Sequence, residues 1–304
     1  MPDMRDASLS TRDAVFLLAL VIFAWGTTWP VNKAILHDIT PIWSTAIRSG
    51  AGAAALLILS LLRGRLRLPA RGDMPVVCSI ALLHMVGFSV LASLGLQHVP
   101  AGRSVVLAYT TPLWVGPGAR LFLGEVFTAR RAAGAGLGLL GLMFILNPLT
   151  FNWGDRPAVY GNLMILLAAL FWAGSILYVR AHRWIADPFD LVFWQALLAT
   201  CVLAPCAALV EGWPQIDWHA GLIVKILYSA VFGIALAYWA ITKVNRALPA
   251  MTTALGLLGV PVFGIAFSAL MLGESPDLPL LAAMALIIAG IVIGTVNASV
   301  RLPK

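Results

Sequence analysis

The sequence predicts an all-α integral membrane protein, with ten transmembrane helices arranged as two inverted five-helix repeats and both chain termini in the cytoplasm. Three observations lead to this fold class. The composition is strongly apolar, clusters of charged residues separate apolar runs of about 20 residues, and residues of the first half recur at constant offsets in the second half.

Composition indicates the solvent in which the chain folds. Hydrophobic residues make up 61% of the 304 positions and charged residues 11%, and the mean hydropathy is +0.92. Soluble domains carry charges at about a quarter of their positions, so this chain is expected to fold in a lipid bilayer. The cysteines, Cys78, Cys201 and Cys206, lie in apolar runs without metal-ligand spacing, and we expect no metal site and no cofactor.

The apolar runs define ten expected spans. A helix needs about 20 predominantly apolar residues to cross a hydrocarbon core about 30 Å thick, and each run is long enough to do so. The expected spans lie at 13–36, 41–62, 75–97, 100–123, 128–146, 158–181, 188–210, 219–243, 248–272 and 277–298.

Basic residues accumulate in every second connection. Four arginines, Arg63, Arg65, Arg67 and Arg71, follow the second span, and pairs of basic residues follow the fourth, sixth and eighth, whereas each alternate connection carries at most one. Because Lys and Arg concentrate on the cytoplasmic side, the basic connections and both termini are placed there. Topology thus explains the net charge of +7, and no nucleic-acid-binding region is expected.

An internal repeat divides the chain into two halves. Pro100, Pro112 and Glu125 recur 149 positions later as Pro249, Pro261 and Glu274, and Trp25, Lys33 and Pro41 recur 147 positions later as Trp172, Arg180 and Pro188. The expected halves are residues 1–146 and 158–304, joined by an extracellular or periplasmic connection at 147–157. Since five helices is an odd number, the second half enters the membrane from the opposite face. Such inverted repeats are typical of transporters, in which exchanging the conformations of the halves changes the open side.

The repeated residues resemble those of the drug/metabolite transporter superfamily, specifically its ten-helix EamA-type exporters. The similarity covers nearly the whole chain and includes Trp25-Gly26, Lys33, Arg48, Leu123-Gly124-Glu125, Trp172 and Arg180. The central tryptophans and tyrosines are similar to those of YddG-type aromatic amino-acid exporters. The resemblance implies a multi-pass protein of the bacterial inner (plasma) membrane that exports aromatic and other neutral amino acids and related compounds by alternating access.

Other functions differ in the residues they require. Multidrug or lipophilic-cation efflux and nucleotide-sugar antiport occur on the same fold, although antiport would call for more central basic residues than Arg48 and Lys225. A membrane enzyme would need paired carboxylates, a metal cluster or an activated nucleophile, so neither enzyme activity nor catalytic residues are expected. The expected partners are a small-molecule substrate and the bilayer, and the protein is expected to be a monomer or homodimer.

The substrate site of an inverted-repeat transporter is expected near the midplane, where the halves meet. Polar and aromatic residues within the spans are the candidates for substrate contacts: Trp25, Trp29, His84, Tyr109, Trp172, Tyr238 and Trp239. Each aromatic residue could instead only fill a helix interface. Arg48 is a candidate gate or carboxylate contact, although it is near enough to the outer end of its span to reach the headgroups. Pro112 and Pro261 are candidate hinges, because proline removes a backbone donor.

Overall fold

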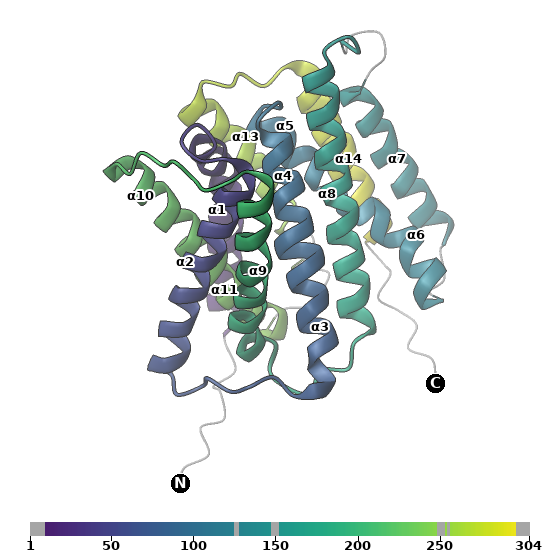
Figure 1. Ribbon diagram of the computed structural model, residues 1–304. Coiled ribbons are helices and arrows are strands. Elements are labelled where there is room, and N and C mark those ends of the chain that lie inside the picture. Colours follow the sequence, from purple (N-terminus) through teal and green to yellow (C-terminus); the bar gives the residue numbers. More distant parts are fainter. Residues whose placement is uncertain (1–9, 125–127, 147–151, 248–252, 254–255, 296–304) are drawn as a thin grey trace, which may run out of the picture.

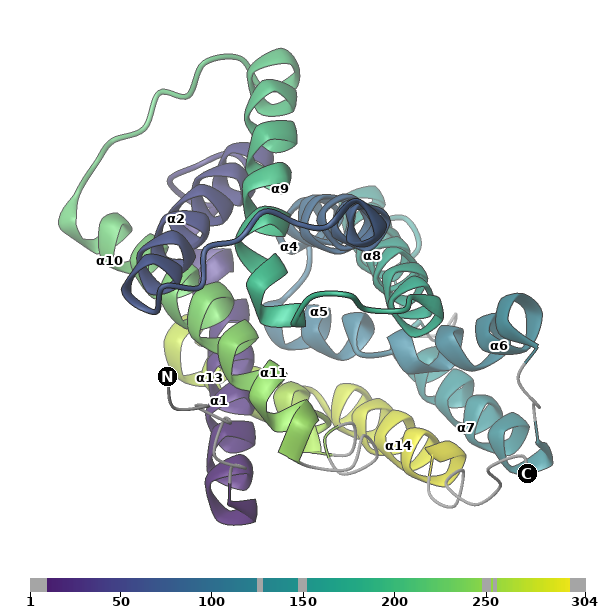
Figure 2. The same cartoon turned by 90° about the horizontal axis from the view of Figure 1, so that it is seen from below.

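The computed structural model describes residues 10–124, 128–146, 152–247, 253 and 256–295 (Figure 1). Within these ranges the regular secondary structure is helical and no strand is found. Most of the helices run roughly along one direction and form a single bundle, seen from its lower end in Figure 2. The helical class expected from the composition is confirmed.

The first half of the chain contains α1 (Thr11–Ile35), α2 (Pro41–Leu62), η1 (Arg71–Asp73), α3 (Met74–Ser79), η2 (Ile80–Phe88), α4 (Ser89–Leu96), α5 (Ala101–Ala108), α6 (Thr111–Leu123) and α7 (Ala129–Ile145). The second half contains α8 (Arg156–Ala181), α9 (Pro188–Val210), α10 (Ala220–Tyr228), η3 (Ser229–Leu236), α11 (Ala237–Ala247), α13 (Gly259–Leu272) and α14 (Leu278–Thr295).

Six of the helical stretches are long and apolar enough to cross a bilayer: Thr11–Ile35, Pro41–Leu62, Arg71–Leu96, Arg156–Ala181, Pro188–Val210 and Ala220–Ile241. The protein is therefore a multi-pass membrane protein. The other expected spans contain helices as well, namely α5 with α6, α7, α13 and α14. The count of ten spans and their orientation stay predictions.

Two of the long stretches change from α-helix to π-helix near their middle. The π-helix η2 lies between α3 and α4, and η3 lies between α10 and α11. A π-helix has wider turns, because each N–H bonds to the carbonyl five residues earlier, and it often marks a functional site. The two π-helices begin at Ile80 and Ser229, which are 149 positions apart.

The candidate hinge prolines follow breaks in the helices. The chain turns at Tyr109 and Thr110 between α5 and α6, and Pro112 comes at the start of α6. Pro112 has no N–H to donate to the carbonyl of Ala108, four positions earlier. That carbonyl accepts a hydrogen bond from the hydroxyl of Thr111 at 2.7 Å. Pro261 likewise comes in the first turn of α13, after a turn at residues 257–258. Both prolines thus lie where a helix can bend, and their role as hinges stays a prediction.

Close packing of glycines joins α7 to α14, which lie side by side in Figures 1 and 2. A Cβ on Gly134 would lie 2.4 Å from the carbonyl oxygen of Gly290, and one on Gly290 would lie 2.5 Å from that of Gly134. Only glycine permits this approach of two backbones. The glycines of α7 and α14 therefore pack these two helices of the same chain against each other.

At each end of the bundle, a carboxylate links separate segments of the chain through hydrogen bonds or an ion pair. Asp73 is fully buried and accepts hydrogen bonds from His182 Nε2 (2.9 Å) and from the backbone N–H groups of Ile185 (3.1 Å) and Ala186 (2.8 Å). At the other end, Lys33 forms an ion pair with Glu274 at 2.9 Å. Glu125, the counterpart of Glu274 in the first half, lies outside the described residues.

Candidate functional site

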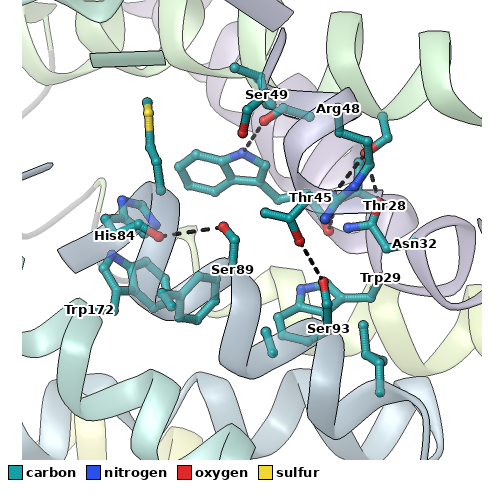
Figure 3. Close-up of a pocket in the computed structure, with 18 of the residues that line it drawn as sticks. Thr28, Trp29, Asn32, Thr45, Arg48, Ser49, His84, Ser89, Ser93 and Trp172 are labelled. Atoms are coloured by element: carbon teal, nitrogen blue, oxygen red, sulfur yellow. Dashed lines mark hydrogen bonds between the residues drawn. The ribbon is translucent and has the colours of Figure 1, made fainter. Parts of the chain in front are cut away.

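A cavity lies inside the bundle and is lined by residues of both halves of the chain (Figure 3). Its lining comes from α1, α2, η2, α4, the end of α5, α8, α9, η3 and α11. Its volume is about 140 Å³, room for on the order of ten water molecules at roughly 10–15 Å³ each. The cavity can therefore hold a small organic molecule.

One side of the cavity is a cluster of rings, which we call the aromatic cluster: His84, Phe88, Tyr109, Trp172 and Tyr238. The imidazole of His84 stacks on Trp172, with ring centroids 5.3 Å apart and planes 11° apart. Tyr109 meets the same indole edge-on, with centroids 5.4 Å apart. The hydroxyl of Tyr238 lies 3.2 Å from His84 Nδ1. Helices from both halves thus contribute to one apolar surface with a few polar atoms.

Two tryptophans of α1 extend this surface. Trp25 Nε1 donates to the carbonyl of Gly233 in the π-helix η3 at 3.1 Å, and its ring meets the edge of Tyr238 with centroids 6.1 Å apart. Trp29 meets Phe88 edge-on, with centroids 6.3 Å apart. The indole of Trp25 therefore connects α1 to η3 at the cavity wall.

The opposite side of the cavity carries a buried cation. Figure 3 shows Arg48 and Asn32 across the cavity from His84 and Trp172. Arg48 is only 9% exposed; its Nε donates to the carbonyl of Ser44 (3.2 Å) and its Nη1 donates to Ser229 Oγ (3.4 Å). The Ser229 hydroxyl in turn donates to Asn32 Oδ1 at 2.7 Å.

No aspartate or glutamate is found among the described residues that line the cavity. No ion pair involves Arg48 within the described part of the chain. The polar side therefore has one full positive charge, surrounded by hydroxyl and amide groups. Within the same described residues, no group of His, Cys, Asp and Glu could hold a metal ion.

The structure places most of the sequence candidates together. Seven of them line the cavity: Trp25, Trp29, Arg48, His84, Tyr109, Trp172 and Tyr238. Trp239 does not line it, because the next residue on a helix faces a direction about 100° away from Tyr238. The Trp239 ring instead lies 5.2 Å from the Arg63 guanidinium carbon and 5.4 Å from Lys243 Nζ.

Sequence reasoning missed the small polar residues of the lining: Asn32, Thr45, Ser49, Ser89, Ser93 and Ser229. A signal was present for four of them. Thr45 and Ser49, and likewise Ser89 and Ser93, are four positions apart in apolar stretches, so each pair shares one face of its helix. The hydroxyls of Thr45 and Ser93 lie 3.1 Å apart and join α2 to α4.

Apolar membrane-spanning helices around a cavity with polar and aromatic walls are the arrangement expected of a membrane transport protein. The chain belongs to the EamA-like transporter family, which it matches twice, over residues 13–147 and 159–296.

Similar proteins are known across most of the chain. The uncharacterized transporter YvbV of Bacillus subtilis is 30% identical, with 92% of this chain and 90% of that protein covered. A probable amino-acid metabolite efflux pump of Salmonella typhimurium is 28% identical, with 96% and 98% covered. One solved crystal structure has the same fold, with a TM-score of 0.67 and 22% identity over 94% of this chain and 97% of the other.

Proposed function

We propose that the protein exports small metabolites across the bacterial inner membrane, above all aromatic and other neutral amino acids and related compounds. The observation that carries this proposal is the aromatic cluster, because stacked and edge-on rings at the wall of a central cavity suit an aromatic or apolar side chain. The name of the Salmonella relative, a probable amino-acid metabolite efflux pump, supports the same substrate class.

Alternating access follows from two inverted halves, residues 1–146 and 158–304. The two separate matches to the family support this division. Equivalent features 149 positions apart support it too: the π-helices η2 and η3, and the glycines Gly124 and Gly273, which end α6 and α13 with φ of 67° and 68°. The first helix of each half also packs on helices of the other half: α1 lies on α13, and α8 lies on α5 and α6.

The proposed orientation places the basic connections and both termini in the cytoplasm. We expect a cysteine at Arg67 to react with a membrane-impermeant maleimide only from the cytoplasmic side and a cysteine at Gln215 only from outside. Both positions are exposed. They follow the C-terminal ends of α2 and α9, which lie on opposite sides of the membrane in this topology. The background must lack Cys78, Cys201 and Cys206, of which the last two are exposed. Labelling of both positions from one side would contradict the topology.

Substrate class is tested by competition in liposomes. Purified protein is reconstituted with labelled phenylalanine inside, and efflux is measured with competing compounds present. We expect neutral amino acids to compete, and we expect a nucleotide sugar and the lipophilic cation tetraphenylphosphonium not to, because the described lining offers neither several basic groups for phosphates nor an acid for a cation. Stronger competition by either of these two compounds would contradict the proposed substrate class.

A further inference from the structure

We propose that Arg48 is a carboxylate-binding residue and that the cavity selects its substrates by charge. In this view the transported molecules are small apolar or aromatic carboxylic acids without net positive charge, and a free amino group is not required. The inference rests on the proposed export function and deepens it, since it names the part of the substrate that the protein recognises.

The first argument is the incomplete bonding of the guanidinium. Arginine carries five N–H donors, and Arg48 directs one from Nε to Ser44 and one from Nη1 to Ser229. Its Nη2 has no acceptor among the described residues, although the side chain is 91% buried and lines the cavity. Burying a cation without a counter-ion costs free energy. A hydrogen-bond acceptor that enters the cavity therefore gains more free energy by binding Arg48 than by binding a guanidinium in water.

The second argument is that Arg48 is held in place from three helices. The carbonyl of Ser44 in α2 binds Nε, and Ser229 at the start of η3 binds Nη1. Ser229 is fixed in turn by its hydrogen bond to Asn32 in α1. A planar guanidinium oriented in this way presents its remaining donors to a carboxylate at little entropic cost.

The third argument is the charge balance around the cavity. Two lysines close in sequence to lining residues are paired with acids. Lys225, four positions before Ser229, donates to Asp38 at 2.8 Å, a bond that holds the pKa of the Asp38 carboxyl below its usual range. Lys33, which follows Asn32, pairs with Glu274 at 2.9 Å. Arg48 has no such partner in the part of the chain that the structure describes, and the described lining offers no acid to an ammonium group. A cation–π contact with the aromatic cluster recovers only part of that loss. The site therefore favours an anion over a zwitterion, and a zwitterion over a cation.

The arrangement also orients the ligand. The carboxylate binds at Arg48, and the apolar part extends across the cavity toward His84 and Trp172 on the opposite side (Figure 3). A molecule such as 3-phenylpropanoate, with a ring two carbons from its carboxylate, has this polarity. Phenylalanine has the same skeleton with an added ammonium group.

The test compares four compounds that share a phenyl ring and differ in their charged groups: the anion 3-phenylpropanoate, the zwitterion phenylalanine, the uncharged 3-phenylpropanamide and the cation 2-phenylethylamine. Binding to the purified protein in lipid nanodiscs is measured by calorimetry at pH 7. We expect 3-phenylpropanoate to bind at least as tightly as phenylalanine. We expect it to bind roughly 10- to 100-fold more tightly than the amide, the range of one charge-assisted hydrogen bond, and the amine to bind most weakly.

Variants at Arg48 identify the group responsible. Arg48→Gln is expected to abolish the preference for the acid over the amide, whereas Arg48→Lys, which keeps the charge but loses the planar fork, retains part of it. Arg67→Gln is the matched control, because Arg67 is exposed in the connection after α2. Among the described residues its one hydrogen bond is made by its backbone carbonyl, which accepts from Trp194 Nε1. The control should leave the ranking of the four compounds unchanged.

Clear outcomes would overturn the inference. Equal binding of acid and amide by the wild-type protein, no binding of any acid, or an unchanged preference in Arg48→Gln would each do so. If Arg48→Gln does not fold, the wild-type ranking and Arg48→Lys decide. Export of phenylalanine with no discrimination by charge would contradict this inference alone. Charge-selective binding in the absence of any transport in liposomes would contradict the proposed function alone.

Discussion

Replacing Trp172 by alanine is expected to weaken binding of aromatic substrates by roughly 10- to 100-fold, the range typical of a central aromatic contact. Trp172 contacts His84, Tyr109 and Phe88, with ring centroids 5.3, 5.4 and 5.3 Å away, so its loss opens the aromatic cluster at the point where elements of both halves meet. Competition against labelled phenylalanine in liposomes measures the loss. Tyr109→Ala should act in the same direction.

The control for this prediction is Trp213→Ala. Trp213 is 83% exposed and stacks on Trp43 with centroids 6.3 Å apart, away from the cavity, so its removal should leave substrate competition unchanged. Folding is followed by thermal denaturation of each variant in detergent. If Trp172→Ala loses thermal stability while the surviving protein binds phenylalanine with unchanged affinity, Trp172 only packs helices together.

Replacing Gly134 by alanine is expected to destabilise the bundle by about 1–3 kcal/mol, the usual cost of overpacking. The new Cβ would lie 2.4 Å from Gly290 O and 2.7 Å from Gly294 N, and both are backbone atoms that move only if α7 and α14 separate. Thermal denaturation of the purified protein measures the effect. Gly290→Ala should have a similar effect, because its Cβ would lie 2.5 Å from Gly134 O.

The same helix provides the control. A Cβ on Gly136 meets nothing within 4 Å, so Gly136→Ala tests the helix propensity of alanine without the clash and should be neutral or stabilising. Neither α7 nor α14 contributes to the described lining of the cavity, so substrate affinity should change little in any of these variants. Equal thermal stability of the Gly134→Ala and Gly136→Ala proteins would contradict the packing described here.

The candidate site was predicted in part, and adjacent residues show where prediction stopped. Tyr238 and Trp239 are both aromatic residues within the eighth expected span, yet Tyr238 lines the cavity and Trp239 contacts Arg63 and Lys243. Residue type and depth in the membrane are the same for both. The rotation of the helix about its axis distinguishes them, and that rotation is set by packing against other helices.

The sequence by itself determined the membrane class and the bounds of several long helices. The expected spans 41–62 and 188–210 coincide with α2 and α9, and 13–36 differs from α1 by two residues or fewer at each end. These boundaries are local, because the thickness of the bilayer sets the length of an apolar run and charged residues end it. Each can be read from neighbouring residues alone.

Tertiary structure decided which residues meet. The stacking of His84 on Trp172 joins residues 88 positions apart, and the bond from Arg48 to Ser229 joins residues 181 positions apart. The absence of a carboxylate beside Arg48, within the described residues, follows from the same packing, since Asp38 and Glu274 bind Lys225 and Lys33. Contacts at such separations depend on how the helices pack and rotate, and no local pattern in the chain encodes them.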